Sequence, residues 1–399
     1  MSRCRLERGG PSWLLGQRWC GIATIHLCVL LACISCRRGV EAQIQASASP
    51  EQVNTTALKE TCVVPTLESP IPQYNNAIWC GTLQLAWNKL KNDIIREPIG
   101  LIGADRLSGE LNNARLSAHD LDAGSFYADA GLVSDGILER IGEQMAKRFP
   151  AEPKPLFSGQ YTQALPTIVA YSYLYVNIPF TPPFSNRPFA FTFRQSNGKS
   201  VETTSFCGLP RAARDQVDVL DYDACTGFDR AGFDTAEFVV DLCKSTEPYQ
   251  IILARIPCPR SLGEGVASVE ERIARFREKS DYGNERKLKQ EDSLIVPDVL
   301  FKLQHHFGEL EGRSLANVRF EGYHLFEVVQ IVDFGLSRTG LTLKSEVRLG
   351  TTRAGPAEKP RYLHFDRPFL IYIKKRAASS SPFCVMWVDN GELMKKWRN

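Results

Sequence analysis

The spacing of apolar residues predicts a helix near the start of the folded part of the chain. Between Asn76 and Ile95, apolar side chains recur every three or four residues, so they fall on one helical face. These residues are Trp79, Leu83, Ala86, Leu90 and Ile94. Pro98 follows, and because proline cannot continue a helix, we expect the helix to end before it.

Two further helices are predicted by the same periodicity, over residues 135–149 and 266–279. Ser134 or Asp135 is the expected cap of the first, and Pro150 its expected stop. Its apolar face comprises Ile137, Leu138, Ile141, Met145 and Phe149. The apolar side of the other helix comprises Val266, Val269, Ile273 and Phe276. Residues 99–133 show only weak patterning and are assigned no element.

From residue 167 onward, β-branched and aromatic runs predict strands. Residues 167–177, TIVAYSYLYVN, are expected to form a buried strand. Alternating runs on both sides of Asn197-Gly198 are a strong signal for a hairpin. The remaining strands are expected at residues 237–242, 251–256, 293–296, 300–304, 326–332, 341–347, 368–374 and 383–388. Helices toward the N-terminal half and mixed, largely antiparallel sheets toward the C-terminal half predict an α+β fold.

Composition and charge narrow the range of functions. The 399 residues carry a net charge of only +3, with acidic and basic residues mixed, so we expect no nucleic-acid partner. We find no nucleophile with its base, no metal-ligand spacing and no phosphate-binding loop, and we expect neither catalysis nor a cofactor or metal. His364 and Asp366 share a predicted strand face and could form a hydrogen bond, which we interpret as a structural pair.

Residues 1–42 are typical of an export signal. Arginines precede an apolar run, residues 21–34, that is too short to span a bilayer. Cleavage after Ala42 would release a soluble secreted protein. The alternative is a bacterial lipobox, LLAC, in which Cys33 would receive the lipid and anchor the protein to the cell envelope.

Residues 43–74 are rich in Ser, Thr, Gln and Pro and are predicted to be a linker, followed by a single domain over residues 75–399. The cysteines after the apolar run form no C-x-x-C pair, which disfavours a zinc ribbon or a thioredoxin-type motif. In an exported chain they can form disulfide bonds, and buried free thiols are the alternative.

Five stretches resemble a known family. They are IVAYSYLYVNIPFTPPF, FTFRQSNGKSVETTSF, FVVDLCKSTEPYQIILARIPCPRSL, SLIVPDVLFKLQHHF and HFDRPFLIYIKKRAASSSPFCVMWVDNGE. In this order they resemble the central-sheet strand with its proline-rich crossing, the following hairpin, the paired core strands, a Pro-containing strand and the C-terminal signature of serpins. The chain therefore resembles a divergent serpin over roughly residues 160–390.

The resemblance places LTLKSEVRLGTTRAGPAEKPRYLHFDRPF, residues 341–369, at the serpin hinge and reactive-centre loop. An inhibitory loop inserts into the main sheet after cleavage, which buries alternate side chains. Here Arg348 and Arg353 would be buried without partners, and Pro356 and Pro360 would remove hydrogen-bond donors. We therefore expect a loop that cannot insert. The reactive-loop-like residues are Arg348, Thr351, Thr352, Arg353 and Ala354.

The expected function is that of an exported, monomeric, non-inhibitory serpin-like protein with a binding or structural role, whose partner would be a protein. The alternative is a serine-type protease inhibitor with Arg353-Ala354 as the reactive bond, and a third reading is an unrelated exported enzyme. Residues 348–361 are expected to be exposed, so that trypsin-like proteases can cut at Arg353 or Arg361.

Overall fold

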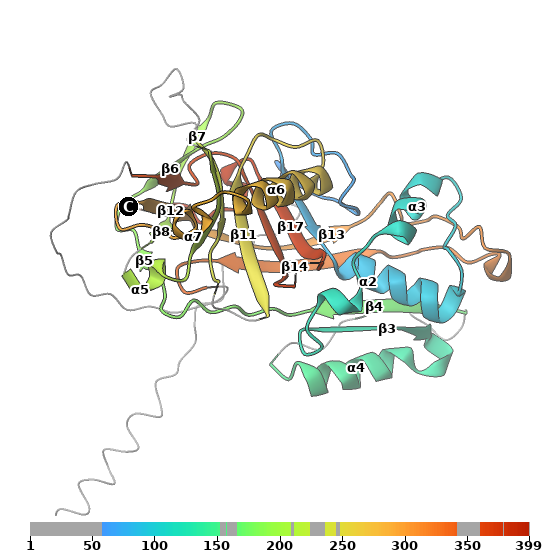
Figure 1. The fold of residues 1–399 in the computed structure, drawn as a ribbon. Helices are drawn as coiled ribbons and strands as arrows, with labels where there is room; N and C mark the ends of the chain where they lie inside the picture. Colours follow the sequence, from blue (N-terminus) through green and yellow to red (C-terminus); the bar gives the residue numbers. More distant parts are fainter. Residues whose placement is uncertain are drawn as a thin grey trace, which may run out of the picture. The chain divides into compact units, whose positions relative to one another are not determined.

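The computed structural model (Figure 1) describes the greater part of one unit of the chain, residues 50–399. The described residues are 58–151, 157, 166–208, 211–223, 236–244, 248–340, 360–377 and 379–398. Within these ranges, early helices alternate with strands and later strands dominate. The predicted α+β class, with mixed and largely antiparallel sheets, is confirmed. Among the same residues, no helix combines the length and the apolar character needed to cross a membrane.

A seven-stranded sheet forms the centre of the molecule. Its strands, in spatial order, are β1 (Thr61–Val63), β2 (Asn76–Cys80), β17 (Pro382–Val388), β16 (Phe369–Lys375), β11 (Tyr249–Arg255), β10 (Glu237–Asp241) and β9 (Asp218–Asp223). Only β1 and β2 run parallel. Every residue of β2, β11 and β17 is buried, so both faces of these strands are covered. The predicted pairing of β10 with β11 is confirmed.

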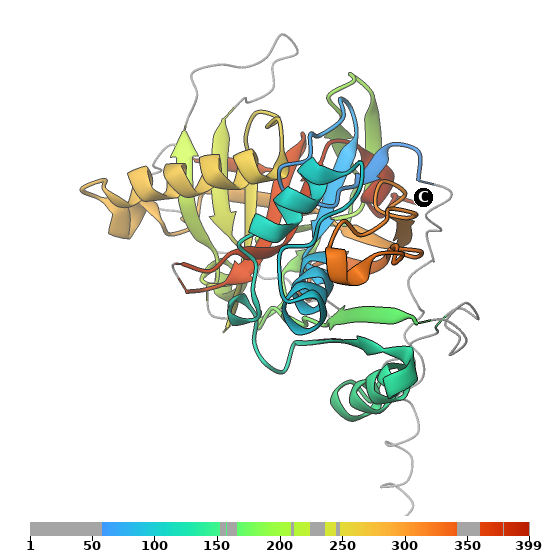
Figure 2. The same cartoon turned by 90° about the vertical axis from the view of Figure 1, so that its right-hand side faces the viewer.

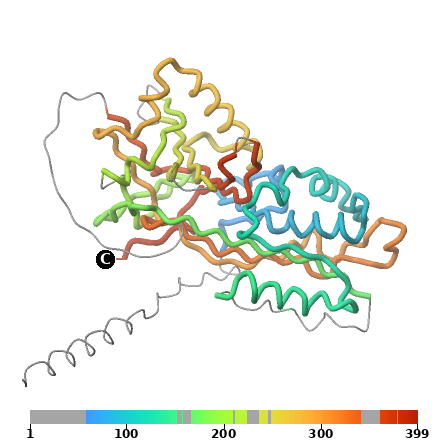
Figure 3. The backbone as a smooth tube through the Cα atoms, turned by 60° about the horizontal axis from the view of Figure 1, so that its bottom comes forward, coloured from blue at the N-terminus to red at the C-terminus, as the bar shows by residue number. Residues whose placement is uncertain are grey.

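The first predicted helix is correct only in its second half. Asn76–Cys80 is strand β2, and the helix α2 begins at Thr82 and ends at Lys89. A π-helical turn, η2 (Leu90–Ile95), follows it. Five consecutive buried residues, NAIWC, fit a helix face or a doubly covered strand equally well. Pairing with β17, which lies about three hundred residues later, decides for the strand, and Figure 3 shows this blue segment against the red C-terminal one.

Residues 99–133, which the pattern left unassigned, contain α3 (Asp105–Asn113), η3 (Ala118–Asp120) and β3 (Phe126–Leu132). β3 pairs antiparallel with β4 (Ile168–Leu174). The strand predicted at residues 167–177 is therefore present, but the prediction that it is buried is wrong: only Val169 is buried, because β3 is its only partner among the described strands. Helix α2 lies against one face of this pair and α4 (Ile137–Arg148) against the other (Figure 2).

Helix α4 confirms the second prediction, although its N-terminus differs from the expected one. Gly136 occupies the cap position with φ of 74°, and no side chain caps the helix. Ser134 and Asp135, the expected caps, lie in the turn η4 (Val133–Asp135), where the Ser134 hydroxyl donates to Asp135. Tyr171 and Tyr173 pack against the small core under α4, and burial raises the pKa of Tyr171 to about 12. Tyr175 is exposed, so the tyrosines at alternate positions 171, 173 and 175 are only partly buried.

The other local predictions match closely. Helix α6 (Leu262–Arg277) packs on the seven-stranded sheet and is capped by Ser261, whose hydroxyl accepts from the Glu264 N–H at 3.2 Å. The hairpin forms from β6 (Phe191–Arg194) and β7 (Ser200–Thr203). The short helices and turns that remain are α5 (Arg211–Arg214), α7 (Tyr282–Glu285), η5 (Val318–Phe320) and η6 (Gly391–Leu393).

A four-stranded sheet lies near one end of the large sheet. Its spatial order is β15 (Tyr362–His364), β12 (Ser293–Pro297), β8 (Ser205–Cys207) and β5 (Ser185–Asn186). β13 (Val299–His306) and β14 (Val329–Leu336) form a separate antiparallel pair. The strand predicted at residues 341–347 lies outside the described residues. The expected linker, residues 43–74, is described from residue 58 onward, and there it contributes β1 to the large sheet.

Candidate functional site

The two ends of segment 341–359 lie at opposite edges of the four-stranded sheet. Before the segment, Ser337 and Gly340 close a tight turn with reciprocal backbone hydrogen bonds of 3.1 Å. In that turn the Arg338 carbonyl accepts from the Phe184 N–H at 2.8 Å, directly before the edge strand β5. After the segment, the chain enters β15, the other edge strand. The segment therefore leaves beside one edge of this sheet and returns into the other.

The departing end is fixed by a glycine and a buried arginine. Gly340 has φ of 110°, and an added Cβ would lie 2.3 Å from the Ile178 carbonyl oxygen, so a side chain cannot be placed there. Arg338 is buried and donates through Nη1 to the Phe184 carbonyl at 3.5 Å. Its Nη2 has no hydrogen-bond partner among the described residues. A buried guanidinium that is only partly bonded marks this end as unusual.

Asp298, a partly buried carboxylate, interacts with the charge of Arg338 at the departing end. Burial raises the pKa of Asp298, and the Thr204 hydroxyl and the charges of Lys395 and Arg338 oppose that shift. The hydroxyl of Thr204 donates to Asp298 Oδ2 at 2.5 Å. Asp298 therefore partly compensates the charge of Arg338, although no hydrogen bond joins the two.

The returning end is fixed by Arg361, which is buried rather than exposed as the sequence suggested. Its backbone N–H donates to Asp292 Oδ1 at 3.0 Å, and its Nη2 donates to Asp292 Oδ2 at 2.6 Å. Its Nη1 donates to the Glu285 carbonyl at 2.7 Å, and its Nη2 also donates to the Lys287 carbonyl at 2.6 Å. The guanidinium lies 5.7 Å from the centre of the Tyr222 ring. The polar, proline-containing composition around Arg361 concealed this cluster, because its partners lie in a distant, highly charged stretch of the sequence.

His364 and Asp366 have separate partners. His364 Nε2 lies 2.8 Å from the Ser293 hydroxyl on the neighbouring strand β12. Asp366 Oδ1 accepts from Arg255 Nη1 at 3.0 Å, and Asp366 Oδ2 pairs with Arg194. Asp366 is thus bonded to two guanidinium groups. Asp366 links the returning chain to β11 through Arg255 and to β6 through Arg194, so these contacts replace the predicted pairing of His364 with Asp366.

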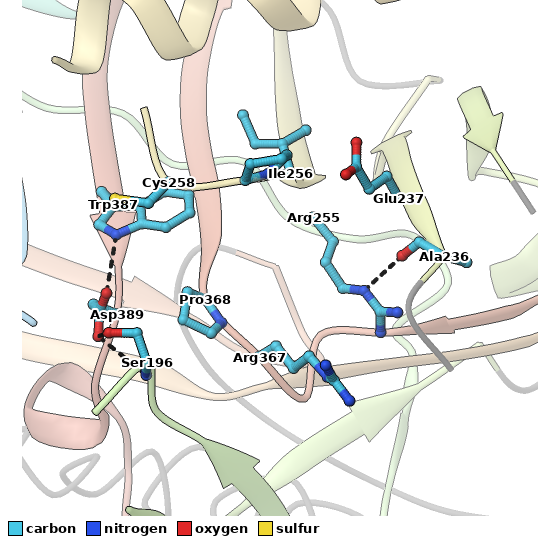
Figure 4. A pocket seen from close by; sticks show the side chains of 11 residues that line it. Ser196, Ala236, Glu237, Arg255, Ile256, Cys258, Arg367, Pro368, Trp387 and Asp389 are labelled. Atoms are coloured by element: carbon cyan, nitrogen blue, oxygen red, sulfur yellow. Dashed lines mark hydrogen bonds between the residues drawn. The ribbon is translucent and has the colours of Figure 1, made fainter. Parts of the chain in front are cut away.

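A hollow of about 260 Å³ opens beside this returning chain (Figure 4). It is lined by Ser196, Ala236, Glu237, Arg255, Ile256, Pro257, Cys258, Arg367, Pro368, Trp387 and Asp389. Its polar groups are largely bonded to one another: Arg255 Nε donates to the Ala236 carbonyl at 2.8 Å, and the Ser196 hydroxyl donates to Asp389 at 2.5 Å. The hollow is small and its wall is bonded internally, as in a structural crevice.

The chemistry of the hollow does not supply a nucleophile. Cys258 is exposed by surface area, but partial desolvation, with the charge of Asp389, raises the pKa of its thiol to about 11, so the thiol is protonated at neutral pH. A larger hollow of about 640 Å³ lies between β1 and α3, where Asp105, Glu110 and Glu309 face Arg106 and Arg313. Over the described ranges, no three His, Cys, Asp or Glu side chains gather in a way that could hold a metal ion.

The sequence-predicted site residues lie outside the described part of the chain. These are Arg348, Thr351, Thr352, Arg353 and Ala354 of the reactive-loop-like stretch and the lipidation candidate Cys33. The structure instead identifies the residues that hold the ends of the stretch, above all Arg338, Gly340, Arg361 and Asp292. The glycine was visible in the sequence, but its role was not, because that role depends on the backbone of residues 178–180.

Comparisons with known proteins find structural neighbours only. No protein-family model matches the chain, and no curated protein matches it in sequence. Among solved structures, the chain is similar to Serpin48 of the insect Tenebrio molitor, with 12% identity and a TM-score of 0.44 over 79% of this chain and 92% of that one. Native protease nexin-1 with heparin gives the same four values.

A third similar structure is human glycosylated kallistatin, with 13% identity and a TM-score of 0.47 over 80% of this chain and 92% of that one. At this level the similarity describes what the chain resembles in fold, and no residue's role is carried over from these proteins.

Proposed function

We propose that the chain is an exported, non-inhibitory serpin-like protein that binds a partner protein through segment 341–359 and has no catalytic activity. The placement of the two ends of this segment supports the proposal most directly. The edge strands β5 and β15 of a four-stranded sheet lie about 14 Å apart. A chain of this length can reach roughly 60 Å when extended. The segment therefore has much more chain than the crossing requires, and the excess is available to a partner.

The residue types of the segment favour binding over insertion into a sheet. Arg348 and Arg353 would each cost several kcal/mol if they were buried unpaired in a covered sheet. Pro356 and Pro360 cannot donate backbone hydrogen bonds to neighbouring strands. Because basic residues outnumber acidic ones in the segment, we expect the partner to present an acidic surface.

The alternative is a serine-type protease inhibitor with Arg353-Ala354 as the reactive bond. An arginine followed by a small residue, between two fixed chain ends, is a suitable substrate for a trypsin-like protease. The two proposals differ in the state of the protein after cleavage. An inhibitor retains the protease and gains a sheet strand, whereas a binding protein is simply nicked.

Limited trypsin digestion of the full chain tests the proposal. We expect cleavage at Arg353 and none at Arg361, because the latter is buried and fully bonded. The nicked protein should show a melting temperature unchanged or slightly lower, and no complex with trypsin on a denaturing gel. Arg353→Gln is the matched control and should remove the main cut. A gel-stable complex, or a large thermal gain after cleavage, would establish the inhibitor alternative instead.

Export is the second part of the proposal and has its own measurement. Residues 1–42 are proposed to be removed as a signal, or to be shortened to a lipidated Cys33 in a bacterial envelope. Mass spectrometry of the N-terminus of the native protein distinguishes the two outcomes. A mature chain that retains Met1 would contradict export, and an unmodified start at Gln43 would contradict lipidation.

A further inference from the structure

Two buried cysteines lie directly opposite each other on two neighbouring strands of the large sheet. Cys80 is the last residue of β2, just before α2, and Cys384 lies in the C-terminal strand β17. They are direct register partners in the antiparallel pair of β2 and β17. Residues directly opposite in an antiparallel pair project to the same face of the sheet. The two thiols therefore lie on one side of the sheet, next to each other.

The hydrogen-bond pattern places Cys80 and Cys384 at a non-hydrogen-bonded position, where opposite α-carbons lie closer together than at a hydrogen-bonded one. The Gly81 N–H donates to the Phe383 carbonyl at 2.8 Å, so Gly81 and Phe383 form a hydrogen-bonded pair. Hydrogen-bonded and non-hydrogen-bonded pairs alternate, so Cys80 and Cys384 occupy a non-hydrogen-bonded position. The α-carbons at such positions are about 4.5 Å apart, and disulfides span about 4.4 to 6.8 Å. The α-carbon separation expected at this position therefore falls within the range that a disulfide bond requires.

No other pair of described cysteines is arranged in this way. Cys62 lies opposite Ala77, and Cys207 lies opposite Ile295 and Ser185. Cys243 and Cys258 lie outside the paired strands. In the structure all six described cysteines are free thiols. Within these ranges, the register therefore selects one pair for oxidation.

We propose that Cys80 and Cys384 are a modification site at which a disulfide bond links β2 to the C-terminal strand β17. The oxidant is a small-molecule or protein disulfide. One cysteine thiolate attacks a sulfur of that disulfide, forms a mixed disulfide and expels one thiolate. The second cysteine then attacks the mixed disulfide and releases the other thiolate, so that both cysteine protons end on the two released thiols. The proposal does not depend on the function of segment 341–359.

The burial of the pair determines when the bond forms. Cys80 is 9% exposed and Cys384 is 6% exposed. Burial raises the pKa of both thiols, that of Cys384 well above its ordinary value, and the proximity of Cys80 adds to the shift at Cys384. Neutral, shielded thiols exchange slowly. The bond therefore forms while β2 and β17 are still assembling, and after folding it is protected from reductants.

The bond would close a loop that contains almost the whole folded unit. Long loops lose the most chain entropy when they are cross-linked in the unfolded state. We expect the oxidised protein to melt at least about 5 °C above the reduced protein. The difference should be reproduced at several protein concentrations, because the link is intramolecular.

The test uses the full chain, refolded with a mixture of oxidised and reduced glutathione or, in parallel, with a reductant only. After alkylation in denaturant and digestion without reduction, we expect a peptide that links Cys80 to Cys384 and weighs two hydrogens less than the sum of its parts. Alkylation of both thiols in the oxidised sample, or linkage of either to another cysteine, would overturn the proposal. This mapping uses the unmodified chain, so it does not depend on any variant folding.

Substitution of single cysteines then tests whether the Cys80–Cys384 disulfide bond causes the melting difference. Cys80→Ala and Cys384→Ala should each abolish the melting difference between the oxidised and reduced preparations. Cys258→Ala, at an exposed cysteine with no cysteine opposite, is the matched control and should preserve the difference. A melting difference that survives Cys384→Ala would show that another pair carries the stabilisation, and would contradict the proposal.

Discussion

The seven-stranded sheet and the layer formed by α4, β3 and β4 bury similar sequences to very different depths. Strand β17, PFCVMWV, is buried at every residue. Strand β4, IVAYSYL, is just as rich in apolar and aromatic residues, yet only Val169 is buried. The first strand lies between neighbouring strands in a large core, whereas the second has one described strand partner and a small core of its own. Apolar composition therefore predicts that a strand forms, and its neighbours determine how deeply it is buried.

The two regions also differ in how the surroundings of a carboxylate shift its pKa. In the large sheet, Asp241 is almost fully buried, and burial raises its pKa even though Arg376 donates to it at 2.6 Å. In the layer, partial burial also acts on Asp129, but the hydrogen bonds from Arg140 and Tyr127 outweigh it and hold its pKa below the ordinary value of 3.8. In the sheet, desolvation outweighs the ion pair of Asp241 with Arg376, whereas in the layer the hydrogen bonds of Asp129 prevail and hold α4 against β3.

The largest expected effect comes from placing a charge in each region. Val240 lies in β10 and is fully buried, so Val240→Asp should cost more than about 5 kcal/mol and prevent folding. Leu174, at the end of β4, is only partly buried, so Leu174→Asp should cost roughly 1–3 kcal/mol. Urea unfolding of the two variants measures the comparison. Equal losses would mean that the layer is as deeply buried as the sheet.

A cavity in each region gives a smaller and more local difference. Ile371→Ala in β16 should lower the free energy of unfolding of the whole domain by about 3–4 kcal/mol. Ile141→Ala removes equally buried methyl groups from α4, but the small core should respond by local opening. We expect amide exchange in α4 and β3 to accelerate about 100-fold while β11 is little affected. Uniform acceleration in both variants would show that the layer unfolds only with the sheet.

Acidification should produce the smallest effect, and with opposite signs in the two regions. The folded-state pKa of Asp129 is lowered, so its contribution to stability is present above pH 3.8 and is lost as the pH falls further. The folded-state pKa of Asp241 is raised, so its protonation stabilises the folded state as the pH falls through that raised pKa toward 3.8. Below about pH 4, amides of β3 should lose protection before those of β10. Asp129→Asn should remove this acid sensitivity, and an unchanged profile in that variant would contradict the assignment.

Elements held by local signals could be predicted from the sequence. Helix α6 has its periodic face in one continuous stretch, although it begins at Leu262, four residues before the predicted start. The β6–β7 hairpin carries Asn197-Gly198, with Gly198 at φ of 83°. Strands β10 and β11 follow each other closely and pair directly. In each case the residues that decide the structure lie within a few positions of one another, so the pattern contains the answer.

Elements that depend on distant partners could not be predicted in this way. Asn76–Cys80 is a strand because β17 pairs with it, and β3, FYADAGL, contains Ala, Asp and Gly, which are uncommon in strands, so it is not recognised without β4. The same reason applies to the candidate site. From the sequence alone, Arg361 is predicted to be an accessible basic residue. Its burial becomes apparent only when the fold places Asp292 beside it, where the two side chains form an ion pair. The role of segment 341–359 remains a prediction from the sequence.

The spatial order of the large sheet has a consequence for the synthesis of the chain. The two last strands, β16 and β17, are inserted between β2 and β11, which were made long before them. Until about residue 388 has left the ribosome, the sheet therefore consists of two separate parts with open edges. Such edges are sites of aggregation in incomplete chains. A nascent protein of this kind completes its fold only after synthesis, and premature termination near the C-terminus leaves β2 without the strand that pairs it with the rest of the sheet.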